Sequence, residues 1–175
     1  MSAVGAAIAG IYGVIHDQIT YTISEEYFTR FKFIQFSNAK PASDDPRVFV
    51  GIIGFLASWW VGAFVGWILA RISISREGRL ARVREMAVAY GIVFFVASAS
   101  AGCGWIWGQW RRGTGYAEGW LIWMEECGVV DQDAFMTVGY IHNASYLGGI
   151  LGAAGGIAYL RKLRHCRAER ELLAA

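Results

Sequence analysis

The sequence predicts an all-α fold, an integral membrane four-helix bundle with short interfacial helices on the outer side. Three observations lead to this class. First, 55% of the 175 residues are hydrophobic and only 17% are charged, which is apolar for a soluble domain. Second, the long uncharged runs reach the roughly 20 residues that a helix needs to cross a bilayer. Third, the 22 glycines lie mostly inside those runs, where glycine lets membrane helices pack closely.

Four segments are expected to span the membrane, and together they form one domain over residues 1–175. The first span is the least apolar, because polar residues follow its apolar part from position 16 onwards. The other three are long runs with few charges, as transmembrane helices usually are. The expected spans are residues 3–23, 48–72, 86–107 and 135–160.

The basic residues predict the orientation of the bundle. Two short segments, 71–84 and 161–170, hold most of the arginines of the chain. The positive-inside rule places both segments in the cytoplasm, so both termini are expected there and residues 24–47 and 108–134 outside. The expected location is the inner (cytoplasmic) membrane of the cell, with the lipid bilayer as partner. The basic tail is expected to set topology and touch anionic lipid, and no nucleic acid is expected as a partner.

The two outer segments are expected to be ordered. Ser24 can cap a short helix that has Glu25 and Glu26 in its first turn. Tyr27, Phe28, Phe31 and Ile34 would share one face of that helix, which suggests a helix lying in the membrane interface. The sequence leaves open whether this segment dips back into the membrane. Cys103 and Cys127 both fall toward the outer side, where a disulfide between them is one option.

Small residues at four-residue spacing predict tight helix packing in three spans. Such ridges let helix backbones approach closely in lipid. The pattern leaves open whether the partner helix lies in the same chain, in a second copy of a homo-oligomer, or in other membrane subunits. The ridges are Gly5, Ala9 and Gly13; Gly54, Ser58, Gly62, Gly66 and Ala70; and Ser145, Gly149, Gly152 and Gly156.

Polar side chains continue two of these ridges into one layer. Asp17 lies four residues after Gly13, with His16 on the adjacent flank, and His142 lies three residues before Ser145. These side chains should therefore face the bundle interior, both histidines about 10 Å below the outer boundary. The layer is expected to include Gln18 and Asn143 as well, with Tyr12, Tyr140, Ser145 and Tyr146 as lining.

Several functions suit such a layer. Imidazole and carboxylate ligands suit a transition metal, which predicts a site at His16, Asp17 and His142, with Glu25 and Glu26 as additional ligands from the outer segment. A b-type haem between His16 and His142 is a further option, as is a path for protons or a small solute. Catalytic residues remain unknown. The competing interpretation is a structural or accessory subunit of a membrane complex, in which a hydrogen bond from His142 to Asp17 only fixes the helix register.

The segment HDQITYTISEEYFTRFKFIQF, residues 16–36, resembles a segment shared by uncharacterised bacterial multi-pass membrane proteins. A proline often stands in that group where this chain has Glu25, and either residue suits the first turn of a helix. The resemblance implies a bacterial membrane protein. It brings no activity and no functional residue with it.

Overall fold

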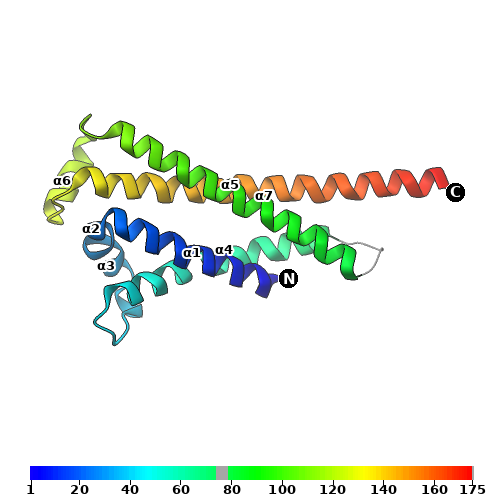
Figure 1. Cartoon of the computed structure of the whole chain (residues 1–175), viewed down its shortest axis with the longest axis horizontal. Helices are drawn as coiled ribbons and strands as arrows, with labels where there is room; N and C mark the ends of the chain where they lie inside the picture. Colours follow the sequence, from blue (N-terminus) through cyan, green and yellow to red (C-terminus); the bar gives the residue numbers. More distant parts are fainter. Residues whose placement is uncertain (74–78, 175) are drawn as a thin grey trace.

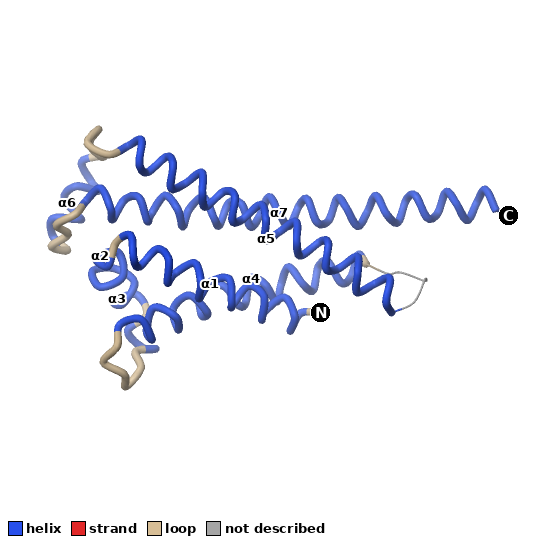
Figure 2. The backbone as a smooth tube through the Cα atoms, viewed as in Figure 1, coloured by secondary structure: helices blue, strands red, loops and turns tan. Residues whose placement is uncertain are grey.

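The protein was analysed as a computed structural model, which describes residues 1–73 and 79–174. Within those ranges the chain is helical, with no strand, so the predicted all-α class is confirmed (Figure 2). Four long helices make up the body, and short helical segments connect them. The long helices are α1 (Ser2–Ile23), α4 (Pro46–Ile72), α5 (Arg79–Arg111) and α7 (Gln132–Ala174); the short ones are α2 (Glu25–Tyr27), the π-helical turn η1 (Phe28–Lys32), α3 (Phe33–Gln35), the 3₁₀ turn η2 (Ser37–Ala39) and α6 (Glu118–Glu126).

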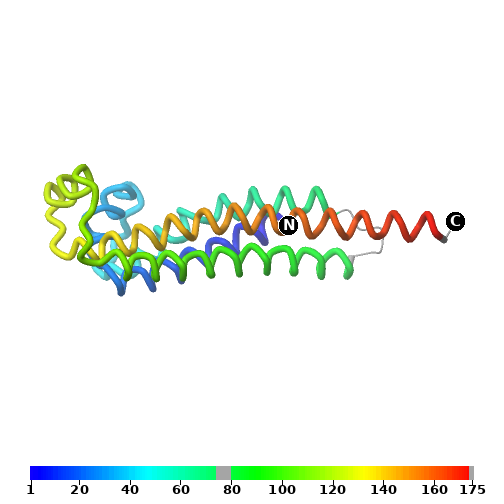
Figure 3. Tube along the Cα trace, turned by 90° about the horizontal axis from the view of Figure 1, so that it is seen from above, coloured from blue at the N-terminus to red at the C-terminus, as the bar shows by residue number. Residues whose placement is uncertain are grey.

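The long helices form two antiparallel pairs, α1 with α4 and α5 with α7 (Figure 1). Each pair packs along most of its length, whereas the two pairs touch each other at few places. The short helices gather at one end of the molecule, and both chain termini lie toward the other end (Figure 3). This arrangement matches the expectation that the two segments 24–47 and 108–134 share one side of the bundle.

Local sequence explains where the helices begin and end. Asp45 caps α4 by accepting a 2.9 Å hydrogen bond from the amide of Arg47, and Pro46 occupies the first helical position, where its missing N–H costs nothing. Ser24 ends α1 in an extended conformation and caps α2. Helices α5 and α7 both run past the predicted spans of 86–107 and 135–160, because the predicted limits counted only apolar residues.

Glycine ridges join α1 to α4 with almost no space between their backbones. A Cβ atom added to Gly5 would overlap the carbonyl group of Gly62, and one added to Gly13 would overlap that of Gly54. The Ser58 hydroxyl donates a 2.5 Å hydrogen bond to the Gly54 carbonyl within this seam. The predicted tight packing of these two ridges is therefore confirmed, and each ridge has its partner in the same chain.

The ridge predicted on the last span is only partly correct. Gly152 packs on the backbone of Val93 in α5, and Gly156 approaches Ala89. A Cβ added to Gly149 meets no atom within 4 Å among the described residues, and Ser145 faces α1 instead. The glycine that packs on α5 at this level is Gly148, where an added Cβ would overlap Ser100. The predicted ridge is therefore off by one position there, and one position turns a side chain by about 100°.

The outer segment after α1 differs from the predicted interfacial helix. The π-helical turn η1 adds an extra residue per turn, which rotates the residues that follow it. Tyr27 and Phe28 are buried as one face would require, but Ile34 is 68% exposed and Lys32 is buried in its place. The face predicted for Tyr27, Phe28, Phe31 and Ile34 is therefore only partly correct, because Ile34 points outward.

The disulfide between Cys103 and Cys127, which the sequence left as one option, is not present, and both cysteines are free. Cys127 lies just beyond the end of α6. Cys103 lies eight residues before the end of α5, which places it about 12 Å along that helix from the outer loops. Cys103 therefore lies deeper along the bundle than Cys127. The sequence did not show this difference.

Two helices, α4 and α5, are long and apolar enough to cross a membrane. Only 28% of the most apolar stretch of α4 is buried inside the protein, and 17% of that of α5. The core helix of a soluble protein is mostly buried, so these low values show that most of both helices faces outward.

The seam between α1 and α4 yields the first prediction. We expect Gly54→Leu to destabilise the fold by about 3 kcal/mol or more, because overpacking of a tight interface forces the backbones apart. Gly149→Leu is the matched control, since its side chain would extend into open space, and it should change stability by under about 0.5 kcal/mol. Unfolding in detergent, followed by circular dichroism, measures both. Equal losses in the two variants would contradict the packing described here.

Candidate functional site

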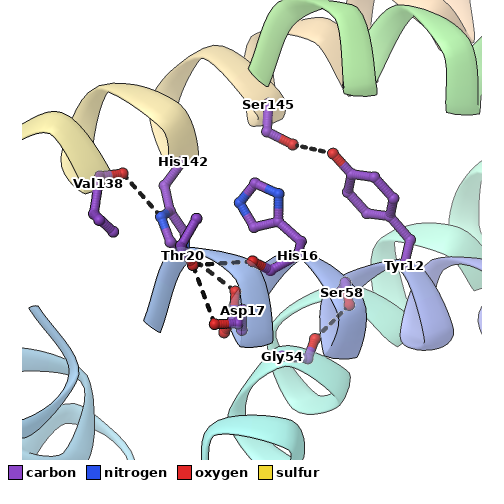
Figure 4. Close-up of polar contacts among 9 residues, drawn as sticks. All are labelled: Tyr12, His16, Asp17, Thr20, Gly54, Ser58, Val138, His142 and Ser145. Carbon is purple, nitrogen blue, oxygen red and sulfur yellow. Dashed lines mark hydrogen bonds and ion pairs between the residues drawn. The ribbon is translucent and has the colours of Figure 1, made fainter. Parts of the chain in front are cut away.

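A buried polar contact links the two helix pairs. Oδ1 of Asp17, on α1, lies 3.2 Å from Nε2 of His142, on α7. Both residues are almost fully enclosed, with exposed fractions of 4% and 2%. Figure 4 shows this contact beside the His16 ring. The two side chains that the sequence placed in one layer therefore meet, although 125 positions separate them in the chain.

The second nitrogen of His142 determines what this contact requires. Nδ1 lies 3.0 Å from the carbonyl oxygen of Val138, and because a carbonyl can only accept, Nδ1 carries a hydrogen. In the neutral imidazole, Nε2 then carries a lone pair that faces a carboxylate oxygen of Asp17. Two acceptors at 3.2 Å need a positive centre between them, which is either a shared proton or a metal ion.

His16 completes a cluster of three side chains. Its ring meets that of His142 edge-on, with the centroids 4.8 Å apart. Its Nε2 atom is sealed from solvent and has no hydrogen-bond partner, and an unpaired buried nitrogen of this kind costs about 1–3 kcal/mol. One ligand atom from each of His16, Asp17 and His142 lies within 4.8 Å of the other two.

Aromatic residues close the cluster toward the outer end. The Tyr27 ring stacks on that of His142, with a centroid distance of 5.0 Å and an interplanar angle of 26°. Phe28 is fully buried beside it. Burial raises the pKa of the Tyr27 phenol above its ordinary value. The Tyr27 contact was not predicted, because it depends on the turn at Ser24 and on the π-helical turn that follows.

Lys32 is a buried ionisable residue near the cluster, and its position was not predicted. Its side chain is buried by η1, with Nζ 5.8 Å from the centroid of the Phe31 ring. Burial lowers the pKa of its amine, and attraction to the Asp17 carboxylate opposes that shift. When Lys32 is protonated, its attraction to the Asp17 carboxylate offsets part of the cost of burying the two charges.

Several predicted members of the layer lie elsewhere. The Gln18 amide binds Arg47 instead, donating to its carbonyl oxygen at 2.8 Å and accepting from its guanidinium at 3.1 Å. Asn143 is exposed, since one position along a helix turns a side chain by about 100°. Of the predicted lining, Ser145 is hydrogen-bonded to Tyr12 at 2.7 Å. Tyr146 approaches His142 at 6.1 Å between centroids, and Tyr140 packs in the outer hydrophobic core.

The two glutamates of the outer segment are not brought to the cluster, which corrects their assignment as additional ligands. Glu25 is exposed. Glu26 accepts hydrogen bonds from the backbone amides of Val130 and Asp131, at 3.0 Å and 2.8 Å. Its carboxylate therefore fixes the start of α7, where negative charge is favourable.

The geometry suits a metal better than a haem. Two ligands of one zinc-like ion with bonds of about 2.1 Å lie about 3.4 Å apart, close to the separation of Asp17 and His142. His16, whose ligand atom lies up to 4.8 Å from the others, must approach by about 1.4 Å at most. The Val138 carbonyl holds the Nδ1 hydrogen of His142, as outer-shell partners of metal-bound histidines usually do. A haem iron would need both rings on opposite faces of a porphyrin, whereas these rings are in direct edge contact.

Comparison with known proteins adds no family to this description. No family model matches the sequence, and neither a curated protein nor a solved structure gives a significant match.

The buried pair yields the second prediction. We expect His142→Leu to cost about 3–5 kcal/mol, because it leaves the Asp17 carboxylate buried without its partner. The double variant Asp17→Leu/His142→Leu should recover most of that loss, since an apolar pair needs no desolvation of charge. Detergent unfolding of the two single variants and the double variant measures the coupling. Additive losses would show that the two side chains do not interact.

Proposed function

We propose that the chain is an integral membrane protein with four spans, formed by α1, α4, α5 and α7. Besides the outward-facing α4 and α5, the apolar side chains of α1 support this placement, because Ile11, Ile15 and Ile19 are each more than half exposed. On α7, Leu147 and Ile150 are exposed as well. An apolar surface of this extent indicates contact with lipid.

The orientation proposed is that of the inner membrane, with both termini cytoplasmic. Two features support it. The termini lie toward one end of the bundle, opposite the short outer helices (Figure 1). The arginines of 161–170, on the far part of α7, and Arg71, at the end of α4, lie at that same end, as the positive-inside rule requires.

The third prediction tests this topology. Asn38 lies exposed in η2, so Asn38→Cys should react with a membrane-impermeant maleimide added to intact spheroplasts. The native Cys166 near the end of α7 should react only after the membrane is opened. Labelling is read by mass spectrometry, with Asn38→Ser as the control for background. Reaction of Cys166 in sealed spheroplasts would contradict the proposed orientation.

We further propose that His16, Asp17 and His142 bind one divalent transition-metal ion in the outer half of the bundle. One observation carries this proposal: the Nε2 atom of His142 and the carboxylate of Asp17 face each other across 3.2 Å while Nδ1 is committed to Val138. The unpaired Nε2 of His16 supplies a third ligand. Two imidazoles and one carboxylate form a known ligand set for such ions, with positions left open for a further ligand.

The second candidate function is proton handling, which the same observation favours. A proton shared between Asp17 and His142 closes the 3.2 Å gap without any metal. Buried ionisable groups within membrane spans often mark proton paths. The structural or accessory subunit remains the alternative without a site. The glycine ridges of α1 and α4 do not support it, because each is already occupied by the other.

The fourth prediction separates these functions. Purified protein should bind one Co²⁺ per chain and show the visible absorption bands of the bound ion. His16→Ala and His142→Ala should each weaken binding by about 100-fold or more, since each removes a ligand and the ligands act together. Glu26→Gln should bind as tightly as the unchanged protein, because that side chain lies outside the cluster.

Acid should release the ion, since the imidazoles must lose their protons to bind it. Protein that binds no Co²⁺, but whose hydrogen-bonded histidine resonances shift with pH only when Asp17 is present, would favour proton handling. Absence of both effects would leave the accessory subunit.

A further inference from the structure

An apolar groove runs beside the candidate site, between α1 and α5. It has a volume of about 690 Å³ and is lined on one side by the isoleucines of α1 from Ile8 to Ile23. Those ends lie fifteen residues apart, about 22 Å along the helix. Phe94 and Trp105 line the opposite wall on α5. The groove exists because the two helix pairs touch each other only at few places.

His16 is shared between the groove and the cluster. Its Nε2 atom is the enclosed nitrogen, and its ring meets that of His142 edge-on. Among the described residues, its Nδ1 atom makes no hydrogen bond either, yet it is not sealed in the same way, and the side chain lines the groove. A metal-bound histidine normally donates its other N–H to an oxygen acceptor, and here the protein provides none.

The other polar residues that line the groove are Tyr12, Thr20, Ser98 and Trp105, and all four are uncharged. The Tyr12 hydroxyl is hydrogen-bonded to Ser145, and the Thr20 hydroxyl donates to the backbone carbonyl of His16 at 3.0 Å. No Lys, Arg, Asp or Glu lines the groove in the described part of the chain. A phosphate head group would have no cation to bind, so a phospholipid does not match the lining.

We propose that this groove binds a neutral quinone with a long hydrocarbon chain. One carbonyl oxygen of the quinone accepts a hydrogen bond from Nδ1 of His16, the aromatic residues contact the ring, and the chain lies along the isoleucines of α1. The complementarity is the unpaired His16 nitrogen beside an uncharged groove whose lining is mainly apolar. The inference concerns binding alone. It rests on the proposed membrane placement, but it holds whether the cluster carries a metal or a proton.

The test uses the full chain in lipid nanodiscs and a decyl-chain benzoquinone as the probe. Bound quinone should quench the fluorescence of Trp105 in a saturable manner, and Trp105→Phe should remove that signal. Gly102→Leu should weaken binding by at least about tenfold, because a Cβ at this groove position meets open space that the leucine then fills. Ala101→Leu serves as the second groove-filling variant.

The matched control is Gly91→Leu, on the same helix and equally unobstructed but outside the groove; it should bind the probe normally. His16→Phe should weaken binding by about fivefold through loss of the single hydrogen bond. His142→Gln should abolish Co²⁺ binding and leave quinone binding unchanged, which separates failure of the metal site from failure of this inference.

Three outcomes would overturn the proposal. Quenching that does not saturate would show simple partition of the probe into lipid. Equal binding by the Gly102→Leu and Gly91→Leu variants would show that the groove is not the site. Displacement of the probe by hexadecane would show that the groove accepts a hydrocarbon chain and recognises no carbonyl.

Discussion

The contact between Asp17 and His142 is the interaction on which the arrangement of the two helix pairs depends. Within each pair, glycines bring the backbones together over most of the contact. Between the pairs, α1 meets α7 at only a few positions. Polar contacts between the pairs include this one, the hydrogen bond between Tyr12 and Ser145, and the bond that the Tyr90 hydroxyl donates to the Met1 carbonyl. In an apolar environment such bonds have no water to compete with them, so they fix the relative register of the pairs.

The contrast between tight packing within each pair and few contacts between the pairs also explains why the cluster and the groove lie side by side. Tight pairs with a loose interface leave space between α1 and α5, and the polar residues of α1 occupy the border of that space. His16 lies at this border, with one nitrogen enclosed beside His142 and the ring lining the groove. A bundle packed equally tightly on all faces would have neither an unpaired nitrogen nor room beside it.

The residue pattern predicted the parts of the fold that follow from helical periodicity. Asp17 and His142 lie on the small-residue faces of their helices, and four-residue spacing was enough to place them together. The same spacing identified Gly13 and Gly54 as members of two tightly packing ridges, and the structure then showed that these ridges contact each other. A regular helix keeps the same spacing over many turns. The all-α class and the meeting of Asp17 with His142 could therefore be predicted from the sequence.

The positions of several side chains could not be predicted, because they depend on irregular helix geometry or on contacts between distant segments. The π-helical turn rotated Ile34 outward and Lys32 inward, and no residue in the segment marks such a turn. The carboxylate of Glu26 suits a metal ligand, but in the structure it accepts hydrogen bonds from backbone amides at the start of α7. These contacts could not be predicted from the residue type. Gln18 lies next to the correct face, and a single step along the helix was enough to direct it to Arg47.

The length of α7 has a mechanical consequence. At 43 residues this continuous helix is about 65 Å long, roughly twice the thickness of a bilayer's hydrocarbon core. His142 lies near one end, so the remaining 32 residues act as a lever arm of about 48 Å. A rotation of about 5° at His142 moves the C-terminal end of α7 by about 4 Å over this length. Small rearrangements around the His142 imidazole are therefore amplified at that end of the helix.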